Sequence, residues 1–436
     1  MDPLKFQVHT FGCKVNTYDT GLLQKNLERS GLRLDSKDPA IHVLNTCAVT
    51  AEATKEAVRT IRKIKAHSPL STVVVTGCAA QVDTGAFENL PGADLVIANS
   101  HKGLLPFYLD QYFKGELKEK VFKSNIFRKD DLEEGGGLEE SHTRAFVKIQ
   151  DGCNSFCSYC IIPYARGKSR SIPIMDLVRR INELTAQGFE EVVLTGVHVG
   201  DYEDSERPAG RGRLEDLIEA LLRLTKVPRF RLTSLEPVEV SERLLEIYRD
   251  PRMCAHFHMS IQSANTEVLK GMKRNYTQKE VIESLEKIQV RVPGAFVGMD
   301  VITGFPTETE EQFEDTYKTL AETPWTRLHV FPYSERKGTK AAILPQIYPH
   351  VRKERAQRLR ELSLHRYQSE ALKQIGLEKW ALGLKDSKNP QGVTRDYWTV
   401  LLSETPPARG EFKVRIEEVV TKNSPRMEGV LRGRYV

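Results

Sequence analysis

Three cysteines stand close together in the middle of the chain, in the pattern Cys-x3-Cys-x2-Cys: Cys153, Cys157 and Cys160, here called the loop trio. Three thiolates in so short a segment can bind three irons of a cubane iron–sulfur cluster and leave the fourth iron open to another ligand. The alternative is a structural zinc site, but such sites take a closed set of four ligands. No second Cys-x2-Cys pair is present to complete one. The spacing therefore favours a cluster with one open iron.

Three further cysteines are far apart in sequence, and each stands just past the end of an apolar run that is expected to be a strand. They are Cys13, Cys47 and Cys78, the N-terminal trio. The carboxyl ends of strands in an open parallel sheet share one crevice, so we expect these thiols to converge and form a second metal site. With no evident fourth ligand, a second cubane is favoured over closed zinc coordination. A buried structural thiol is the alternative for any one of them, and we assign that role to the seventh cysteine, Cys254.

The segments around these cysteines predict an α/β protein with three domains. Apolar runs at residues 6–8, 41–44, 73–75 and 95–97 alternate with helix-like segments. This pattern predicts an N-terminal domain with an open parallel α/β sheet over residues 1–128. The charged, glycine-rich stretch at residues 129–140 is typical of a linker.

Residues 141–374 repeat a strand followed by a helix six times. Strands are expected at 145–149, 192–194, 230–233, 257–261, 297–302 and 328–331, with helices that include 175–185, 214–224 and 278–289. Six units are too few for an eight-stranded barrel, so a partial (β/α)6 barrel is predicted, with its active site at the carboxyl ends of the strands. After a basic helical run at 351–372, strands expected at 397–402, 412–420 and 429–431 predict a small C-terminal antiparallel β-barrel over residues 375–436.

Composition narrows the class of protein. Hydrophobic residues make up 40% and charged residues 28%, as in a globular protein. No stretch approaches the roughly 20 apolar residues of a membrane helix, and the first residues do not begin a secretory signal, so we expect a cytoplasmic protein. Seven cysteines in such a chain favour metal or catalytic work over disulfides. The net charge of +5 is compatible with a polyanionic partner without requiring one.

The chain resembles the radical SAM methylthiotransferases over essentially its whole length. The matching segments are residues 11–16 (FGCKVN), 45–50 (NTCAVT), 76–78 (TGC), 149–153 (IQDGC), 159–167 (YCIIPYARG), 256–263 (HFHMSIQS) and 304–306 (GFP). The first two segments resemble the MtaB type, and residues 375–436 resemble a TRAM domain, a β-barrel that binds RNA. Two features depart from the family pattern: Thr307 stands where a glycine is usual, and the TRAM-like part is poor in glycine.

The resemblance implies an enzyme that converts N6-threonylcarbamoyladenosine (t6A) at position 37 of tRNA, beside the anticodon, to its 2-methylthio form. It implies two 4Fe-4S clusters and two molecules of S-adenosylmethionine, of which one methylates the transferred sulfur and the other yields a radical that removes hydrogen from the adenine C2 carbon. The implied partners are tRNA, an electron donor such as flavodoxin or ferredoxin, and a sulfur source. Two other branches of the family, acting on isopentenyladenosine of tRNA or on an aspartate of a ribosomal protein, stay as alternatives.

The resemblance also implies roles for particular residues. The N-terminal trio would hold the auxiliary cluster that carries the sulfur, and the loop trio the catalytic cluster that generates the radical. Tyr159, just before the last cysteine of the loop trio, corresponds to an aromatic residue that lies against the adenine of the cofactor. Arg166 follows the loop, where its guanidinium is expected to pair with a carboxylate. The other expected cofactor contacts end or follow the second to fourth barrel strands: Thr195, Gly196, Ser234, Glu236 and Gln262.

Simpler interpretations stand beside these. Glu236 precedes a proline and is equally typical of an ordinary loop carboxylate, and His256 and His258 alternate along a strand in the manner of packed or hydrogen-bonded histidines. A non-enzymatic RNA-binding protein with structural metal sites is the competing class for the whole chain. That class explains the terminal barrel and the charge, but not two trios that are each one ligand short of a closed site.

Overall fold

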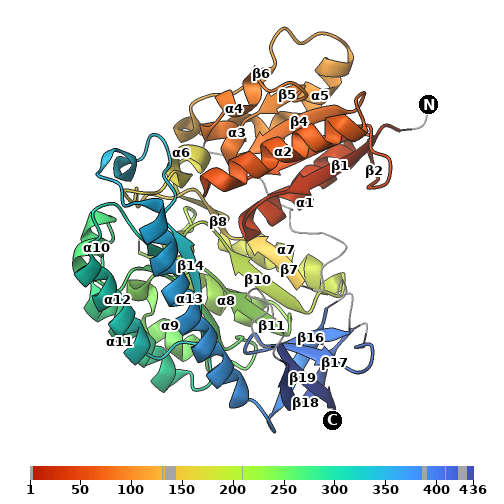
Figure 1. Ribbon diagram of the computed structural model, residues 1–436. Helices are drawn as coiled ribbons and strands as arrows, with labels where there is room; N and C mark the ends of the chain where they lie inside the picture. The colour runs from red at the N-terminus through yellow and green to blue at the C-terminus, as the bar shows by residue number, and fades with distance from the viewer. Residues whose placement is uncertain are drawn as a thin grey trace.

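The computed structural model describes residues 3–129, 132, 144–208, 210–384, 390–407, 409–420 and 430–436. An N-terminal sheet domain lies above a partial barrel, and a small closed barrel lies beside the lower end of the partial barrel (Figure 1). Most of the expected linker at 129–140 lies outside the described residues. No described helix combines the length and the hydropathy that crossing a membrane requires.

The N-terminal domain is built on a six-stranded parallel sheet of order β2-β1-β3-β4-β5-β6. Its strands are β1 (Lys5–Thr10), β2 (Arg33–Leu34), β3 (Ile41–Thr46), β4 (Thr72–Gly77), β5 (Leu95–Ile97) and β6 (Val121–Phe122). Its helices are α1 (Lys14–Arg29), α2 (Ala51–His67), α3 (Cys78–Val82), α4 (Gly85–Glu88) and α5 (Leu105–Phe113), with a 3-10 helix η1 (Asn99–Leu104). The four longer strands match the predicted runs, whereas the two-residue edge strands are too short to give a pattern.

Both faces of this sheet are covered, as expected of a parallel sheet. Apolar residues of α1 and α5 pack against one face and residues of α2 and α3 against the other. β3 and β4 are buried along their whole length, because each residue faces one of these two helical layers. The three strands that precede the N-terminal trio are consequently neighbours with their carboxyl ends at one edge.

The middle of the chain forms two parallel three-stranded sheets, of order β11-β10-β7 and β12-β13-β14. Their strands are β7 (Arg144–Lys148), β10 (Glu191–Thr195), β11 (Arg229–Leu232), β12 (His256–Gln262), β13 (Phe296–Thr303) and β14 (Arg327–Pro332). Isolated parallel bridges, Phe230 to Met253 and Leu235 to Met259, connect the two sheets into a six-stranded partial barrel. The fold class expected from six strand–helix repeats is thereby confirmed.

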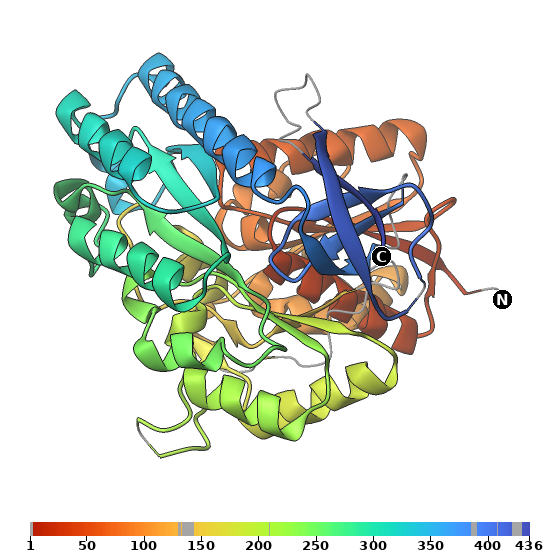
Figure 2. The same ribbon diagram turned by 90° about the horizontal axis from the view of Figure 1, so that it is seen from below.

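Helices cover the outer side of the partial barrel (Figure 2). They are α7 (Ile174–Ala186), α8 (Leu214–Leu224), α9 (Glu242–Ile247), α10 (Thr266–Gly271), α11 (Gln278–Arg291), α12 (Glu310–Glu322) and α13 (Pro349–Leu372). Three short elements surround the cysteine loop: α6 (Ile162–Arg166), β8 (Gln150–Asp151) and β9 (Arg170–Ser171). Thr277 and Thr309 begin α11 and α12 with capping boxes, which supply hydrogen-bond partners to the first turn of each helix.

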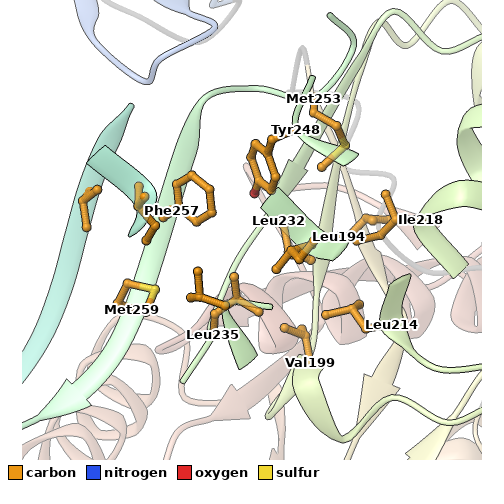
Figure 3. Packing of buried hydrophobic residues seen from close by; sticks show 14 of the residues in the cluster. Leu194, Val199, Leu214, Ile218, Leu232, Leu235, Tyr248, Met253, Phe257 and Met259 are labelled. Atoms are coloured by element: carbon orange, nitrogen blue, oxygen red, sulfur yellow. The ribbon is translucent and has the colours of Figure 1, made fainter. Parts of the chain in front are cut away.

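Alternation along the strands separates the core from the inner face of the partial barrel. Leu194 and Leu232 point toward the helices and lie beside Leu214 and Ile218 of α8, while Phe257 of the same cluster stacks on Tyr248 (Figure 3). A leucine buried as fully as Leu232 stabilises the fold by about 1.5–3 kcal/mol through removal from water. The intervening residues of each strand point inward and are mostly polar. Polar side chains therefore line the inner face of the partial barrel.

The C-terminal part closes into a five-stranded barrel of order β15-β16-β17-β19-β18. Its strands are β15 (Glu378–Gly383), β16 (Gln391–Thr394), β17 (Thr399–Leu402), β18 (Glu411–Val420) and β19 (Val430–Tyr435). All neighbours are antiparallel except β17 and β19, which run parallel to close the ring. This barrel packs under the amino ends of the partial-barrel strands, where Arg229 and Arg231 donate hydrogen bonds to the carbonyl of Thr394 at 3.1 and 3.3 Å.

Thr307, which stands where a glycine is usual in the resembled family, has a φ of 73°. This is the left-handed region, which a β-branched residue enters at a cost of about 1–2 kcal/mol. The backbone of the loop after β13 therefore keeps the conformation that favours glycine, although the side chain has changed.

Candidate active site

The loop trio lies directly beyond β8, at the carboxyl edge of the partial barrel. The amide of Cys160 donates to the carbonyl of Cys157 at 3.0 Å, which folds the loop back on itself. Burial raises the pKa of the Cys160 thiol to about 12, and the charges of Cys157 and Cys153 contribute to the rise. The three thiols thus lie close enough to interact, and Cys160 resists ionisation unless a cation shares the site.

Gln150 and Gly152 set the course of this loop. The side-chain amide of Gln150 donates to the carbonyl of Gly152 at 2.7 Å, and its oxygen accepts from the amides of Val197 and His198, both at 3.0 Å. Gly152 has a φ of 75°, and a Cβ there would lie 1.9 Å from the carbonyl oxygen of Lys168. Only glycine fits this turn, so the chain can reverse and present the cysteines at the strand ends.

Charged side chains surround the loop trio. The Nη1 atom of Arg274 lies 3.1 Å from the Sγ of Cys157 and 2.9 Å from the Oε1 of Glu236. Burial raises the pKa of Cys157, and the Arg274 charge opposes that rise. Burial also raises the pKa of Cys153, but hydrogen bonds from His198 and Ser155 outweigh it and lower the pKa. Arg274 and His198 are neighbours of the thiols that the sequence analysis missed, because neither lies in a recognisable motif.

His198 is held in its charged form by carboxylates. Its Nε2 lies 2.5 Å from the Oε1 of Glu239 and its Nδ1 lies 3.2 Å from the Oδ2 of Asp201. Burial lowers the pKa of His198, but hydrogen bonds with Asp201, Cys153 and Glu239 outweigh this and raise it well above its usual range. A positive imidazolium beside Cys153 favours the thiolate that a metal requires.

The N-terminal trio gathers at the carboxyl ends of three adjacent strands. Cys13 precedes the first residue of α1, Cys47 follows β3, and Cys78 begins α3 directly after β4. A Cβ built on Gly12 would lie 2.6 Å from the Sγ of Cys47, so the backbone beside Cys13 lies against that thiol. Burial raises the pKa of Cys47 to about 12, with the charges of Cys78 and Cys13 adding to the effect. The structure thus brings the three thiols into mutual electrostatic contact.

The distances between the sulfur atoms of each trio indicate which metal group the trio can bind. Thiolates bound to one zinc at about 2.3 Å lie about 3.8 Å apart. Among the described residues, three groups have ligand atoms that all lie within 4.8 Å of one another, and neither trio is among them. A cubane is larger than a single ion and takes more widely separated thiolates. The donor type and the spacing of both trios therefore fit iron–sulfur clusters better than zinc.

A buried network of charges lies between the two trios and joins the N-terminal domain to the partial barrel. The Nη1 atom of Arg166 lies 2.9 Å from the Oδ1 of Asp151, and its Nη2 lies 3.0 Å from the Oδ2 of Asp19. The Nζ of Lys148 lies 2.7 Å from the Oδ1 of Asp19, and the Nζ of Lys102 lies 3.0 Å from its Oδ2. All five side chains are at most 11% exposed. Asp19 thus receives three cations at once.

The pKa values follow from this arrangement. Burial alone would raise the pKa of Asp19, but the charges of Lys102, Lys148 and Arg166 outweigh it and hold the pKa well below its usual range. Arg166 also experiences the charges of Cys78 and Cys13, which places it beside the N-terminal trio. The sequence analysis expected Arg166 to contact the cofactor, whereas its guanidinium here pairs with two carboxylates of the protein itself, Asp19 and Asp151.

The other expected cofactor contacts lie at the carboxyl edge of the partial barrel. Thr195 ends β10, and a Cβ on Gly196 would lie 2.9 Å from the Oε1 of Gln150, so the backbone there is closely packed. Ser234 and Gln262 follow or end their strands with φ values of 62° and 63°. Glu236 pairs with Arg274 as described above. Tyr159 is part of a small apolar cluster, and burial raises the pKa of its hydroxyl well above the usual range.

His256 and His258 do not meet the thiols of either trio within metal-ligating distance. His258 lies 3.2 Å from the Oδ1 of Asp300, and the ring of His256 lies 4.0 Å from the ring of Tyr397. Cys254 is fully buried, and its amide donates to the carbonyl of Phe230 at 2.8 Å. All three residues sit in packed surroundings, away from the carboxyl edge that holds the loop trio.

A partial barrel with a three-cysteine loop at the carboxyl ends of its strands defines a radical SAM enzyme, here joined to a second three-cysteine domain. Residues 147–320 match the model of the Radical SAM superfamily, and residues 5–98 match the Uncharacterized protein family UPF0004. The chain is 40% identical over 363 residues to the threonylcarbamoyladenosine tRNA methylthiotransferase MtaB of Rickettsia prowazekii. This alignment covers 82% of each protein. The chain belongs to the radical SAM methylthiotransferase family, and within it to the MtaB type.

Two further proteins are similar to this chain. A tRNA-2-methylthio-N(6)-dimethylallyladenosine synthase of Anoxybacillus flavithermus is 32% identical over 82% of this chain and 69% of its own length. The radical S-adenosylmethionine methyltransferase TsrM of Kitasatospora setae, solved with cobalamin and a [4Fe-4S] cluster bound, aligns with a TM-score of 0.60 at 15% identity over 79% of this chain and 77% of that chain. The second likeness concerns the fold alone.

Proposed function

We propose that this protein converts t6A at position 37 of tRNA to 2-methylthio-N6-threonylcarbamoyladenosine. The observation that carries the proposal is the pair of three-thiol sites, each at the strand ends of its own domain and neither with its three sulfur atoms all within 4.8 Å of one another. The branch follows from the relatives, because the MtaB protein of Rickettsia prowazekii is more similar to this chain than the dimethylallyladenosine synthase described above.

Each domain would then have a separate task. Residues 1–128 would hold the auxiliary cluster through the N-terminal trio, residues 141–374 would hold the second cluster and the S-adenosylmethionine, and residues 375–436 would bind RNA. When bound, the two clusters and the cofactor supply the sulfur, the methyl group and the radical that an unreactive C2–H bond requires. We assign the cofactor contacts to the residues at the carboxyl edge of the partial barrel: Tyr159, Thr195, Gly196, Ser234, Glu236 and Gln262.

The protein's own side chains would organise this chemistry. Arg274 would neutralise Cys157 and Glu236 together, and charged His198 would stabilise the Cys153 thiolate. The ion network around Asp19 and Arg166 would hold the two cluster domains in a fixed relation, since buried ion pairs with several hydrogen bonds permit few alternative arrangements. We further propose cytoplasmic tRNA as the substrate, with flavodoxin or ferredoxin as electron donor and a separate sulfur source.

The proposal predicts a specific change in tRNA. Mass spectrometry of nucleosides from a host that lacks this gene should show t6A without its 2-methylthio derivative, and the derivative should return when the wild-type gene is restored. A gene with Cys157→Ala, which removes one thiolate of the loop trio, should fail to restore it. Loss of a 2-methylthio-isopentenyl nucleoside instead would reassign the substrate. An unchanged nucleoside profile would point to the ribosomal protein.

A further inference from the structure

Cationic side chains gather on the inner face of the partial barrel, where α1 of the N-terminal domain lies beside β7. This cationic cluster consists of Lys14, Arg144 and Arg231, with the ring of His256 and the hydroxyl of Tyr397 beside them. Burial and the neighbouring cations hold the pKa of His256 well below its usual range, so this imidazole is uncharged. The cluster lies on the side of the barrel strands that faces away from the helical layer. Neither the thiol trios nor the expected cofactor contacts include any of these residues.

The carboxylates near this cluster are too few for its guanidinium groups. Arg144, Glu191 and Arg229 stand side by side in the register of β7, β10 and β11. Glu191 lies 2.8 Å from Arg229 and 2.9 Å from Arg231, but 3.6 Å from Arg144. Glu411 provides a second carboxylate for Arg229 at 3.2 Å. Arg144 therefore has the longest pairing, and its side chain is still 21% exposed.

Lys14 adds a cation that has no carboxylate of its own. It is half-buried at the first position of α1, and its ammonium has no ion pair or hydrogen bond to any residue that the structure describes. The helix that begins with Lys14 packs against β7, and the ionisable groups near its ammonium are Tyr397, Arg144, Arg231 and Asp300. Asp300 is already engaged by His258 and by His329, each at 3.2 Å. A desolvated cation without an anion is costly, so the site favours an anionic ligand.

A second, independent feature points to a polar ligand. His256 is only 2% exposed, and its Nδ1 has no hydrogen-bond partner among the described residues. The ring of His256 lies tilted against that of Tyr397, and the Tyr397 ring lies 4.8 Å from the guanidinium carbon of Arg231. A buried nitrogen of this kind normally has a partner. The anion that Lys14 lacks and the partner that His256 lacks would be found in the same place.

We propose that the cationic cluster binds the free carboxylate of the threonylcarbamoyl group on the substrate adenosine. This inference rests on the proposed function and specifies which residues select the substrate. Lys14 directly follows Cys13, so an anion held by its ammonium lies beside the N-terminal trio, where the base to be modified must approach. A dimethylallyl group carries no charge and would leave Lys14 without an anion and Arg144 with its 3.6 Å pairing to Glu191 alone. The cluster thus favours a carboxylate-bearing adenosine over an apolar one.

The test compares binding of two RNAs by the reconstituted full-length protein. One is an anticodon stem-loop with t6A, and the other is the same stem-loop with unmodified adenosine. Lys14→Gln and, separately, Arg144→Gln should weaken binding of the t6A stem-loop by about tenfold or more, as expected for loss of a charge-assisted contact. Binding of the unmodified stem-loop should change by no more than about twofold. Lys14→Arg, which keeps the charge, should retain part of the preference.

The control is Arg29→Gln, an exposed arginine on the same helix, which should leave both affinities unchanged. Iron content per chain is measured for every variant, because Lys14 adjoins a cysteine of the N-terminal trio. Equal losses of affinity for both RNAs would mean that the cluster contacts backbone phosphate. An undiminished preference for t6A in the variants would mean that the cluster does not contact the modified base. Either result overturns this inference and leaves the proposed function standing. A wild-type protein with no preference for t6A would overturn the proposed function as well.

Discussion

Replacing Cys157 by alanine should abolish the reductive cleavage of S-adenosylmethionine, whereas replacing Cys47 by alanine should leave the cleavage intact and abolish methylthiolation of tRNA. Cys157 belongs to the trio at the barrel edge, beside the residues expected to hold the cofactor, and Cys47 belongs to the trio in the other domain. The two losses should therefore separate. The measurements are 5′-deoxyadenosine by chromatography with dithionite as reductant, and the modified nucleoside by mass spectrometry.

The matched control is Cys254→Ala. This cysteine is also buried, but it packs in the partial barrel away from both trios, so both activities should persist. Cleavage that survives Cys157→Ala would contradict the assignment of the loop trio. If Cys47→Ala abolished S-adenosylmethionine cleavage while the loop trio kept its iron, the two domains would not have the separate roles assigned to them.

Replacing Asp19 by asparagine should lower the free energy of unfolding by about 3–5 kcal/mol, the usual cost of breaking a buried ion pair from one side. After the substitution, Asp151 is the one carboxylate left in the network with the three cations Lys102, Lys148 and Arg166. The buried network then carries a net charge of +2 instead of +1. Anaerobic thermal denaturation of the variant and of the wild-type protein measures the difference. Since the carboxyl pKa values are lowered, the stabilisation is complete at neutral pH and is lost as the pH falls below the ordinary aspartate range.

A compensating change separates charge imbalance from simple loss of packing. Asp19→Asn together with Lys102→Met removes one cation along with the carboxylate and should recover part of the lost stability. Asp38→Asn, at an exposed position, should have no effect. A double variant less stable than the single one, or a single variant as stable as the wild-type protein, would show that the network does not stabilise the junction of the domains.

Much of the fold could be predicted because its signals are local. The buried strands β3 and β4 are continuous apolar runs, and the cysteines that follow them are adjacent in sequence to the strand ends. A parallel sheet then requires the thiols after β1, β3 and β4 to share an edge. The loop trio is still more local, since its three cysteines lie within eight residues of sequence. In both trios, sequence spacing combined with a topological rule was sufficient to place the thiols.

The remaining features depend on contacts between distant segments. Arg166 and Asp19 are 147 positions apart, and Arg274 and Cys157 are 117 positions apart. Nothing in the local pattern of Asp19, one residue of an ordinary helix, distinguishes it from a surface carboxylate. The sequence analysis also missed the edge strands β2 and β6, because a strand of two residues gives no periodic signal. It missed the parallel pairing of β17 with β19, because the closure of a barrel leaves no local pattern in the sequence.

The most direct test of the account is the number of irons that each trio holds after anaerobic reconstitution with iron and sulfide. Wild-type protein should bind about eight irons per chain, and a variant in which all three cysteines of either trio are replaced by alanine should bind about four. One zinc per chain without cubane absorption, or loss of all iron when either trio alone is removed, would contradict two independent clusters.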